Sequence, residues 1–230
     1  MKSVLLTGAA LLLMSGGGYA DDSLSVTAVD ARTLRIQEKV EALFAAGEYD
    51  RAYFIYENEL APVGDKYAQY MLGYMHLIGA GVQQDRIRAS AWYRMAAERG
   101  KTEFVGVRDE LWNALSEADR GRSDEVYRQL RQKYSDIAVV FEQVEADVKN
   151  LTVRTGSRLP GGSQSLTVVN PSQRTARSGD NYYKQIDRRL DASLQFLVEQ
   201  LDLDEPPTKP EDVDLDELRR AVNEYLERVE

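Results

Sequence analysis

The chain has 230 residues, with 38 Asp and Glu against 29 Lys and Arg, a formal net charge of -9, one histidine and no cysteine. Such acidity argues against non-specific binding to nucleic acid or anionic lipid, because both repel negative charge. Without cysteine, and with His76 as its single imidazole, the chain lacks the ligands of ordinary zinc sites and the nucleophile of cysteine-based catalysis.

Residues 1–20 have the pattern of an export signal. Lys2 gives a basic start, an apolar core covers 4–14, and Gly18-Tyr19-Ala20 is typical of a cleavage site. The apolar run is too short to anchor the chain stably across a bilayer. We therefore expect a signal peptide that is cleaved after Ala20, and an exported, periplasmic protein. A retained membrane anchor is the alternative.

Apolar residues at helical spacing predict pairs of helices through the first half of the chain. Two helices are expected between Thr33 and Leu60, separated by Gly47, and Pro62 lies just beyond the second. A second pair and a further helix follow, over about 65–78, 85–99 and 102–117.

Residues 124–151 show a seven-residue apolar rhythm, which predicts one long helix. Its heptad positions are Tyr127, Leu130, Tyr134, Ile137, Phe141, Val144, Val148 and Leu151. One interpretation is a helix that caps the preceding helix pairs and buries this stripe within the chain. The alternative is self-association through the stripe, which would make the protein a homo-oligomer.

The last third changes composition. Residues 152–180 are rich in Gly, Ser, Thr and Arg, which predicts a flexible basic linker, with strand character only around Leu166–Val169. Residues 181–230 form an acidic tail, in which we expect helices over about 182–201 and 214–228. Charge runs of this kind usually only solvate a surface.

Residues 68–100 carry the most specific motif, a Gly-rich elbow between two amphipathic helices. Internal similarity supports a repeat, because Ala52 and Ala89, like Tyr56 and Tyr93, are 37 residues apart. The small residue of each pair allows close helix approach, and the tyrosine fills the space between neighbours.

This segment resembles the Sel-one-like repeat, a family related to the tetratricopeptide repeat. The matching residues are Ala68, Leu72, Gly73, Gly79, Gly81, Val82, Asp85, Ala89, Trp92, Tyr93, Ala96, Ala97 and Gly100. His76 stands at the usual tyrosine position and Arg88 at the usual lysine position. The unit before this one lacks the glycine elbow, and the one after it is degenerate.

The resemblance implies an all-α fold, a short tetratricopeptide-like solenoid with a long capping helix, followed by the linker and the C-terminal helices. We expect the repeat domain and its cap to cover 31–151. Proteins of this family generally act as adaptors or scaffolds, and exported bacterial members often serve envelope complexes. The partner implied is therefore a protein of the cell envelope.

First helices of such repeats line a concave groove, which makes Tyr67, Tyr70 and Tyr74 the candidate partner-binding residues. Tyrosine offers a large contact area with a polar tip. The alternative is that these rings pack between helices.

No catalytic, cofactor-binding or metal-binding residues are predicted. His76, among apolar neighbours, is interpreted as a packing residue. The spacing of Asp212, Asp214 and Asp216 matches the first ligands of a calcium-binding loop, but Glu217 stands where such a loop requires glycine. A non-catalytic adaptor is thus expected, with a cell-wall-acting enzyme as a distant alternative.

Overall fold

The computed structural model describes residues 31–155, 167–170, 175–203 and 210–228. The predicted signal peptide, residues 1–20, lies outside this part of the chain. The chain divides into two compact units between Asp136 and Ile137. This boundary falls inside the repeat domain expected over 31–151, so that domain prediction is corrected.

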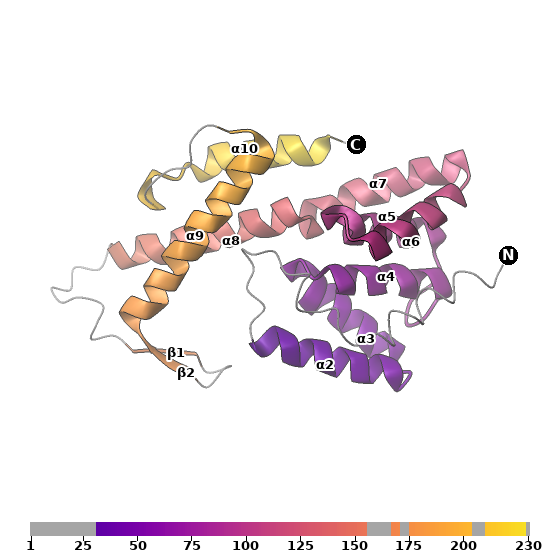
Figure 1. Ribbon diagram of the computed structural model, residues 1–230, viewed down its shortest axis with the longest axis horizontal. Coiled ribbons are helices and arrows are strands. Elements are labelled where there is room, and N and C mark those ends of the chain that lie inside the picture. The colour runs from indigo at the N-terminus through magenta and orange to yellow at the C-terminus, as the bar shows by residue number, and fades with distance from the viewer. Residues whose placement is uncertain (1–30, 156–166, 171–174, 204–209, 229–230) are drawn as a thin grey trace. The chain divides into compact units, whose positions relative to one another are not determined.

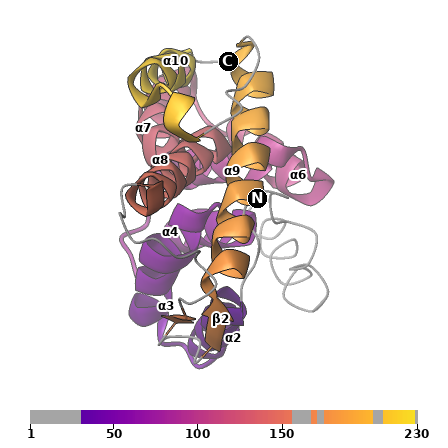
Figure 2. The same ribbon diagram turned by 90° about the vertical axis from the view of Figure 1, so that its left-hand side faces the viewer.

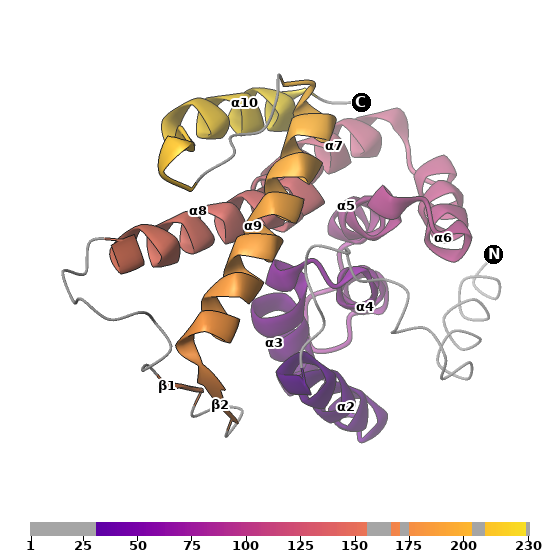
Figure 3. The ribbon, with the colours of Figure 1, turned by 60° about the vertical axis from the view of Figure 1, so that its left-hand side comes forward.

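The first unit is built from consecutive helix pairs, as the sequence predicted (Figure 1). Its elements are α2 (Ala31–Ala45), α3 (Tyr49–Ile55), the π-helix η1 (Tyr56–Leu60), the 3-10 helix η2 (Ala61–Val63), α4 (Lys66–Ile78), α5 (Arg86–Ala96), the 3-10 helix η3 (Ala97–Arg99), α6 (Thr102–Asn113) and α7 (Glu117–Tyr134). Helices α4 and α5 lie side by side as the central pair (Figure 3).

Side-chain caps fix where the central pair begins. The Asp65 carboxylate accepts a hydrogen bond from the Ala68 amide at 2.9 Å and so caps α4. The Asp85 carboxylate caps α5, accepting from the amides of Ile87 at 2.9 Å and Arg88 at 3.0 Å. These carboxylates satisfy amides that have no partner within the helix.

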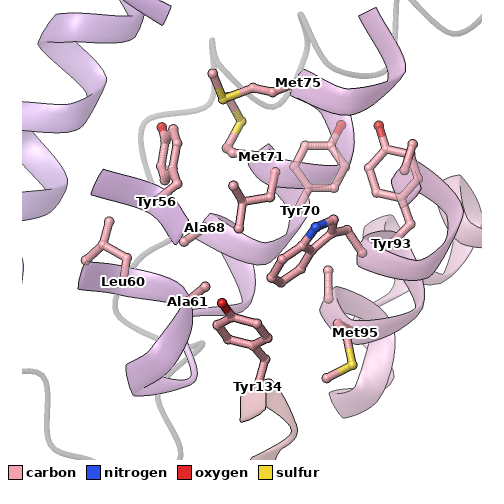
Figure 4. Packing of buried hydrophobic residues seen from close by; sticks show 14 of the residues in the cluster. Tyr56, Leu60, Ala61, Ala68, Tyr70, Met71, Met75, Tyr93, Met95 and Tyr134 are labelled. Atoms are coloured by element: carbon pink, nitrogen blue, oxygen red, sulfur yellow. The ribbon is translucent and has the colours of Figure 1, made fainter. Parts of the chain in front are cut away.

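The repeat residues form the core of this unit (Figure 4). Leu72 and Ala89 are fully buried, and Trp92, Tyr93 and Ala96 are at most 2% exposed. Small residues at Ala89 and Ala96 let α5 approach its neighbours, while the rings of Trp92 and Tyr93 fill the space between helices. All five of these side chains thus lie in the interior of the first unit.

The helix predicted over 124–151 is interrupted, so that prediction is wrong. Helix α7 ends at Tyr134, Ser135 has extended backbone (φ -67, ψ 155), and α8 runs Asp136–Thr155. The Ser135 hydroxyl donates to the Arg131 carbonyl at 2.7 Å.

The heptad side chains do not form an exposed stripe. Six of the eight are buried, and Tyr127 and Leu130 are partly buried against the core of the first unit. Most of the surface proposed for self-association is therefore buried within the chain.

Among the described residues, the second unit contains the rest of α8, a β-hairpin, two further α-helices and a short 3-10 helix (Figure 2). These elements are β1 (Thr167–Asn170), β2 (Thr175–Ser178), α9 (Gly179–Leu201), the 3-10 helix η5 (Pro210–Asp212) and α10 (Leu215–Glu227). The strands pair antiparallel, with Thr167 opposite Ser178. The predicted linker over 152–180 is thus corrected where the structure describes it, because α8 and the hairpin occupy it. Residues 156–166 and 171–174 lie outside the described chain.

Apolar faces and ion pairs hold the second unit together. Leu194 and Leu197 of α9, and Val222 of α10, are at most 3% exposed. The fully buried Asp147 of α8 accepts two hydrogen bonds from the Arg189 guanidinium of α9, one of them 2.8 Å long. The protein is therefore all-α apart from the hairpin within the described residues, and none of its described helices is long and apolar enough to cross a membrane.

Candidate protein-binding surface

Helix α4 exposes a narrow stripe to solvent. Ten of its thirteen residues are buried, and the three others are Tyr67, Tyr74 and Ile78. Tyr67 and Tyr74 are half-buried, whereas Ile78 is 42% exposed. Their spacing of seven and four residues places them along one side of the helix.

Tyr70 belongs to the core, which corrects its assignment as a surface residue. It is 1% exposed, and its ring centroid lies 5.3 Å from those of both Tyr93 and Phe104. The ring therefore fills the space between α4, α5 and α6. Of the predicted binding tyrosines, the structure leaves Tyr67 and Tyr74 at the surface.

Two aromatic residues from the preceding helix pair continue the stripe. The Phe44 ring centroid lies 6.3 Å from that of Tyr74 and 5.1 Å from that of Tyr49, which is 38% exposed. We call Phe44, Tyr49, Tyr67, Tyr74 and Ile78 the aromatic surface. Phe44 and Tyr49 were not predicted as surface residues, because Phe44 lies in an apolar helical pattern and Tyr49 lies just after Gly47.

Two glycines of the repeat set this arrangement. A Cβ on Gly73 would lie 2.7 Å from the Tyr93 ring, so only glycine allows α4 and α5 to approach this closely here. Gly81 has φ +68, and a Cβ there would lie 2.4 Å from the Tyr49 carbonyl carbon. The elbow thus packs against the first turn of α3, which carries Tyr49 of the aromatic surface.

His76 is a packing residue. It is 3% exposed, its Nε2 lies 3.2 Å from the Tyr53 hydroxyl, and that hydroxyl donates to the Glu57 carboxylate at 3.0 Å. Burial lowers the pKa of His76, and the charge of Arg88 lowers it further. The imidazole is therefore neutral at pH 7 and fills the place that a tyrosine usually takes.

The aspartates at 212–216 lie at the N-terminus of α10. The Asp214 carboxylate accepts hydrogen bonds from the amides of Asp216 and Glu217, each at 3.0 Å, and so caps α10. Across the residues that the structure describes, no group of three or more His, Asp or Glu side chains could hold a metal ion.

The first unit has paired helices, a glycine elbow, and small residues that alternate with large ones along the helices. These features define a helical-repeat protein of the tetratricopeptide-like class. Residues 66–101, which cover α4, the elbow and α5, match the family model of the Sel1 (Sel-one-like) repeat. The chain therefore contains a Sel1 repeat over these residues. Sel1 repeats are generally protein-interaction modules. No curated protein and no solved structure matches the chain.

Proposed function

We propose that the protein is an exported, periplasmic adaptor or scaffold without catalytic activity, and that the aromatic surface holds its protein partner. The observation that carries this proposal is that α4, buried on all other sides, presents Tyr67, Tyr74 and Ile78 to solvent. Half-buried tyrosines have few conformations to lose on binding and combine a large apolar ring with a hydrogen-bonding tip.

The surface is also rigid, which favours binding. Lys66, at the start of α4, is fully buried and pairs with Glu98 and Asp136. Gln69 donates to the Tyr134 carbonyl at 2.9 Å and so ties the same turn of α4 to α7. A preformed surface loses less conformational entropy on binding than a flexible one.

Export is supported by residues 1–20, with their basic start, short apolar core and Gly-Tyr-Ala ending. Fractionation of the native cells, with N-terminal sequencing of the protein, tests this part of the proposal. A mature chain that begins at Asp21 in the periplasmic fraction is expected, and an intact chain in the cytoplasm would contradict export.

Crosslinking in intact cells tests the binding surface. Wild-type protein and a Tyr67→Ala, Tyr74→Ala variant are captured, and their crosslinked partners are compared. Phe54→Ala is the matched control, because Phe54 is a 61% exposed aromatic residue outside the aromatic surface. We expect the double variant to lose the principal partner and the control to keep it. An unchanged set of partners in the double variant would overturn the assignment.

A further inference from the structure

His76 is the single histidine of the chain and stands at a repeat position that is usually tyrosine. It lies in the last turn of α4 and is 3% exposed. A tyrosine ring stays uncharged at and below neutral pH, whereas a small fall in pH can charge an imidazole. The repeat therefore has a titratable group buried at a position that is normally uncharged.

Hydrogen bonds around the ring determine which nitrogen carries the proton. The Tyr53 hydroxyl has a single proton, which it donates to the Glu57 carboxylate at 3.0 Å. Toward Nε2 of His76, which lies 3.2 Å away, the same oxygen can therefore only accept. Nε2 carries the proton of the uncharged ring, and Nδ1 is buried without a hydrogen-bond partner among the described residues. A second proton must therefore bind at Nδ1.

The groups that act on the imidazole come from the helices and the loop around it. They are Tyr53 of α3, Glu57 of η1, Gln83 and Asp85 before α5, and Arg88 of α5. Burial lowers the pKa of His76 most, and the charge of Arg88 lowers it further. The Gln83 backbone and the two carboxylates favour the charged ring but do not outweigh these causes. A charged imidazole is thus less stable here than in water.

The same turn of α4 holds both ends of the elbow, which covers residues 79–85. At the start of the elbow, the Gly79 amide donates to the Met75 carbonyl at 2.8 Å. At its end, the Asp85 amide donates to the carbonyl of His76 itself, also at 2.8 Å. A displacement of His76 therefore acts directly on the elbow.

The elbow in turn contacts part of the aromatic surface. Ile78 immediately precedes the elbow, and Gly81 lies against the backbone of Tyr49. Both Tyr49 and Ile78 belong to the aromatic surface. A change in the elbow thus reaches this surface without any contact between His76 and a partner.

We propose that His76 makes the elbow sensitive to pH, so that protonation of its ring in mildly acidic solution opens residues 79–85 and displaces Tyr49 and Ile78. The hydrogen-bond partner of the ring is a hydroxyl, not a carboxylate, and a buried charge without a paired counter-charge requires water. Opening of the elbow admits that water. The consequence for partner binding rests on the proposed function, whereas the opening itself does not.

The direction of the effect follows from the two states of the elbow. In the open state the ring is in water and titrates near its ordinary pKa of 6.5, and in the closed state its pKa is lower. Between these two values the open state binds more protons, so each pH unit favours opening by up to about tenfold. At pH values above 6.5 the ring is uncharged in both states and the elbow stays closed.

NMR and hydrogen exchange test the proposal on the purified full chain, prepared without a histidine tag. Because His76 is the single histidine, the imidazole C–H signals report its titration directly, and we expect a midpoint below 6.5. Exchange of the Gly79 and Asp85 amides, relative to the intrinsic rate at each pH, measures opening of the elbow. We expect their protection to be constant above pH 6.5 and to fall by about threefold or more by pH 5.

Variants assign the effect to the imidazole. His76→Tyr introduces the usual repeat residue and should make the protection of the elbow amides independent of pH. His76→Phe is a second variant with the same expectation. Arg88→Gln removes a charge that lowers the pKa of His76, so the NMR midpoint should rise toward 6.5. Arg86→Gln, which removes the same charge from another exposed position in the first turn of α5, should leave the midpoint unchanged.

Three results would overturn the proposal. The first is a midpoint at or above 6.5, because the closed site would then not oppose the charge. The second is an equal loss of protection in wild type and in the His76 variants, which would assign the opening to carboxylates. The third is constant protection in the wild type, which would show that the closed elbow accepts a charged ring. None of these results bears on the crosslinking experiment, which alone decides the proposed binding surface.

Discussion

The Lys66 ammonium lies 3.0 Å from the Asp136 carboxylate, and the two side chains are 0% and 9% exposed. The Arg99 guanidinium donates two hydrogen bonds of 2.9 Å to the same carboxylate, and a third, of 2.8 Å, to the Gly64 carbonyl. This buried network joins the start of α4 to the end of the repeat and to the first residue of α8.

Lys66→Met removes the ammonium and leaves the carboxylates of Glu98 and Asp136 with less compensation. Removing one partner of a buried ion pair costs about 3 kcal/mol, because the other charge stays buried without it. Urea unfolding followed by tryptophan fluorescence measures the loss, since Trp92 and Trp112 both lie in the first unit. As a control, Arg128→Met breaks the exposed pair with Glu125 and should change stability by less than about 0.5 kcal/mol. Equal effects of both substitutions would contradict a structural role for the network.

The Asp136 carboxylate should also make stability depend on pH. Burial alone would raise its pKa, but Lys66 and Arg99 outweigh burial and hold the pKa below the ordinary value of 3.8. Because the pKa is lower in the folded state, the ionised carboxylate contributes fully to the free energy of unfolding at pH values above 3.8. This contribution is lost as the pH falls through the lower pKa of the folded state. The difference in unfolding free energy between wild type and Asp136→Asn should therefore be large at pH 7 and shrink below pH 4. A difference that stays constant down to pH 3 would contradict ionisation of Asp136 as the cause.

Gly73 has a steric role that alanine substitution tests directly. Its added methyl group would lie 2.7 Å from the ring of Tyr93, which is 2% exposed and cannot swing away. Gly73→Ala should therefore destabilise the first unit by about 1–3 kcal/mol, the usual cost of overpacking. Gly106→Ala is the matched control, because Gly106 lies in α6 with no atom within 4 Å of its added methyl group. That change should stabilise the protein by up to about 1 kcal/mol, since alanine favours helix. A neutral Gly73→Ala variant would show that α4 and α5 can separate without cost.

The central helix pair could be predicted closely because its determinants are local. Asp65 and Asp85 cap the helices that the pattern places after them, and Gly79 ends α4 with φ +74. The break at Ser135 was missed because the apolar pattern continues across it, although Ser followed by Asp commonly begins a helix. The heptad pattern continues across the break, because Tyr134 and Ile137 are three residues apart. Asp136, the first residue of α8, forms an ion pair with Lys66, which is far away in the sequence.

The candidate surface could be predicted only in part, for a similar reason. Helical spacing places Tyr67, Tyr70 and Tyr74 on one broad side of α4, but it does not say where neighbouring helices cover that side. Phe104 of α6 and Tyr93 of α5 cover Tyr70 and leave the other two accessible. The spacing of residues within one helix carries no information about such contacts between helices. That Tyr67 and Tyr74 bind a partner stays a prediction.

Val144 tests whether the heptad stripe of α8 is core or oligomer interface. It is 0% exposed, so Val144→Asp would bury an unpaired carboxylate and should destabilise the second unit by about 3 kcal/mol or more. Urea unfolding followed by circular dichroism measures this loss, and light scattering measures the mass of the folded protein. Glu142→Ala, at an exposed position on the same helix, should leave both unchanged. An interface residue would behave differently, because its charge would split an oligomer into folded protomers of normal stability. If Val144→Asp halves the mass and leaves the free energy of unfolding unchanged, the stripe is an oligomer interface. If the variant loses stability at constant mass, the stripe belongs to the core.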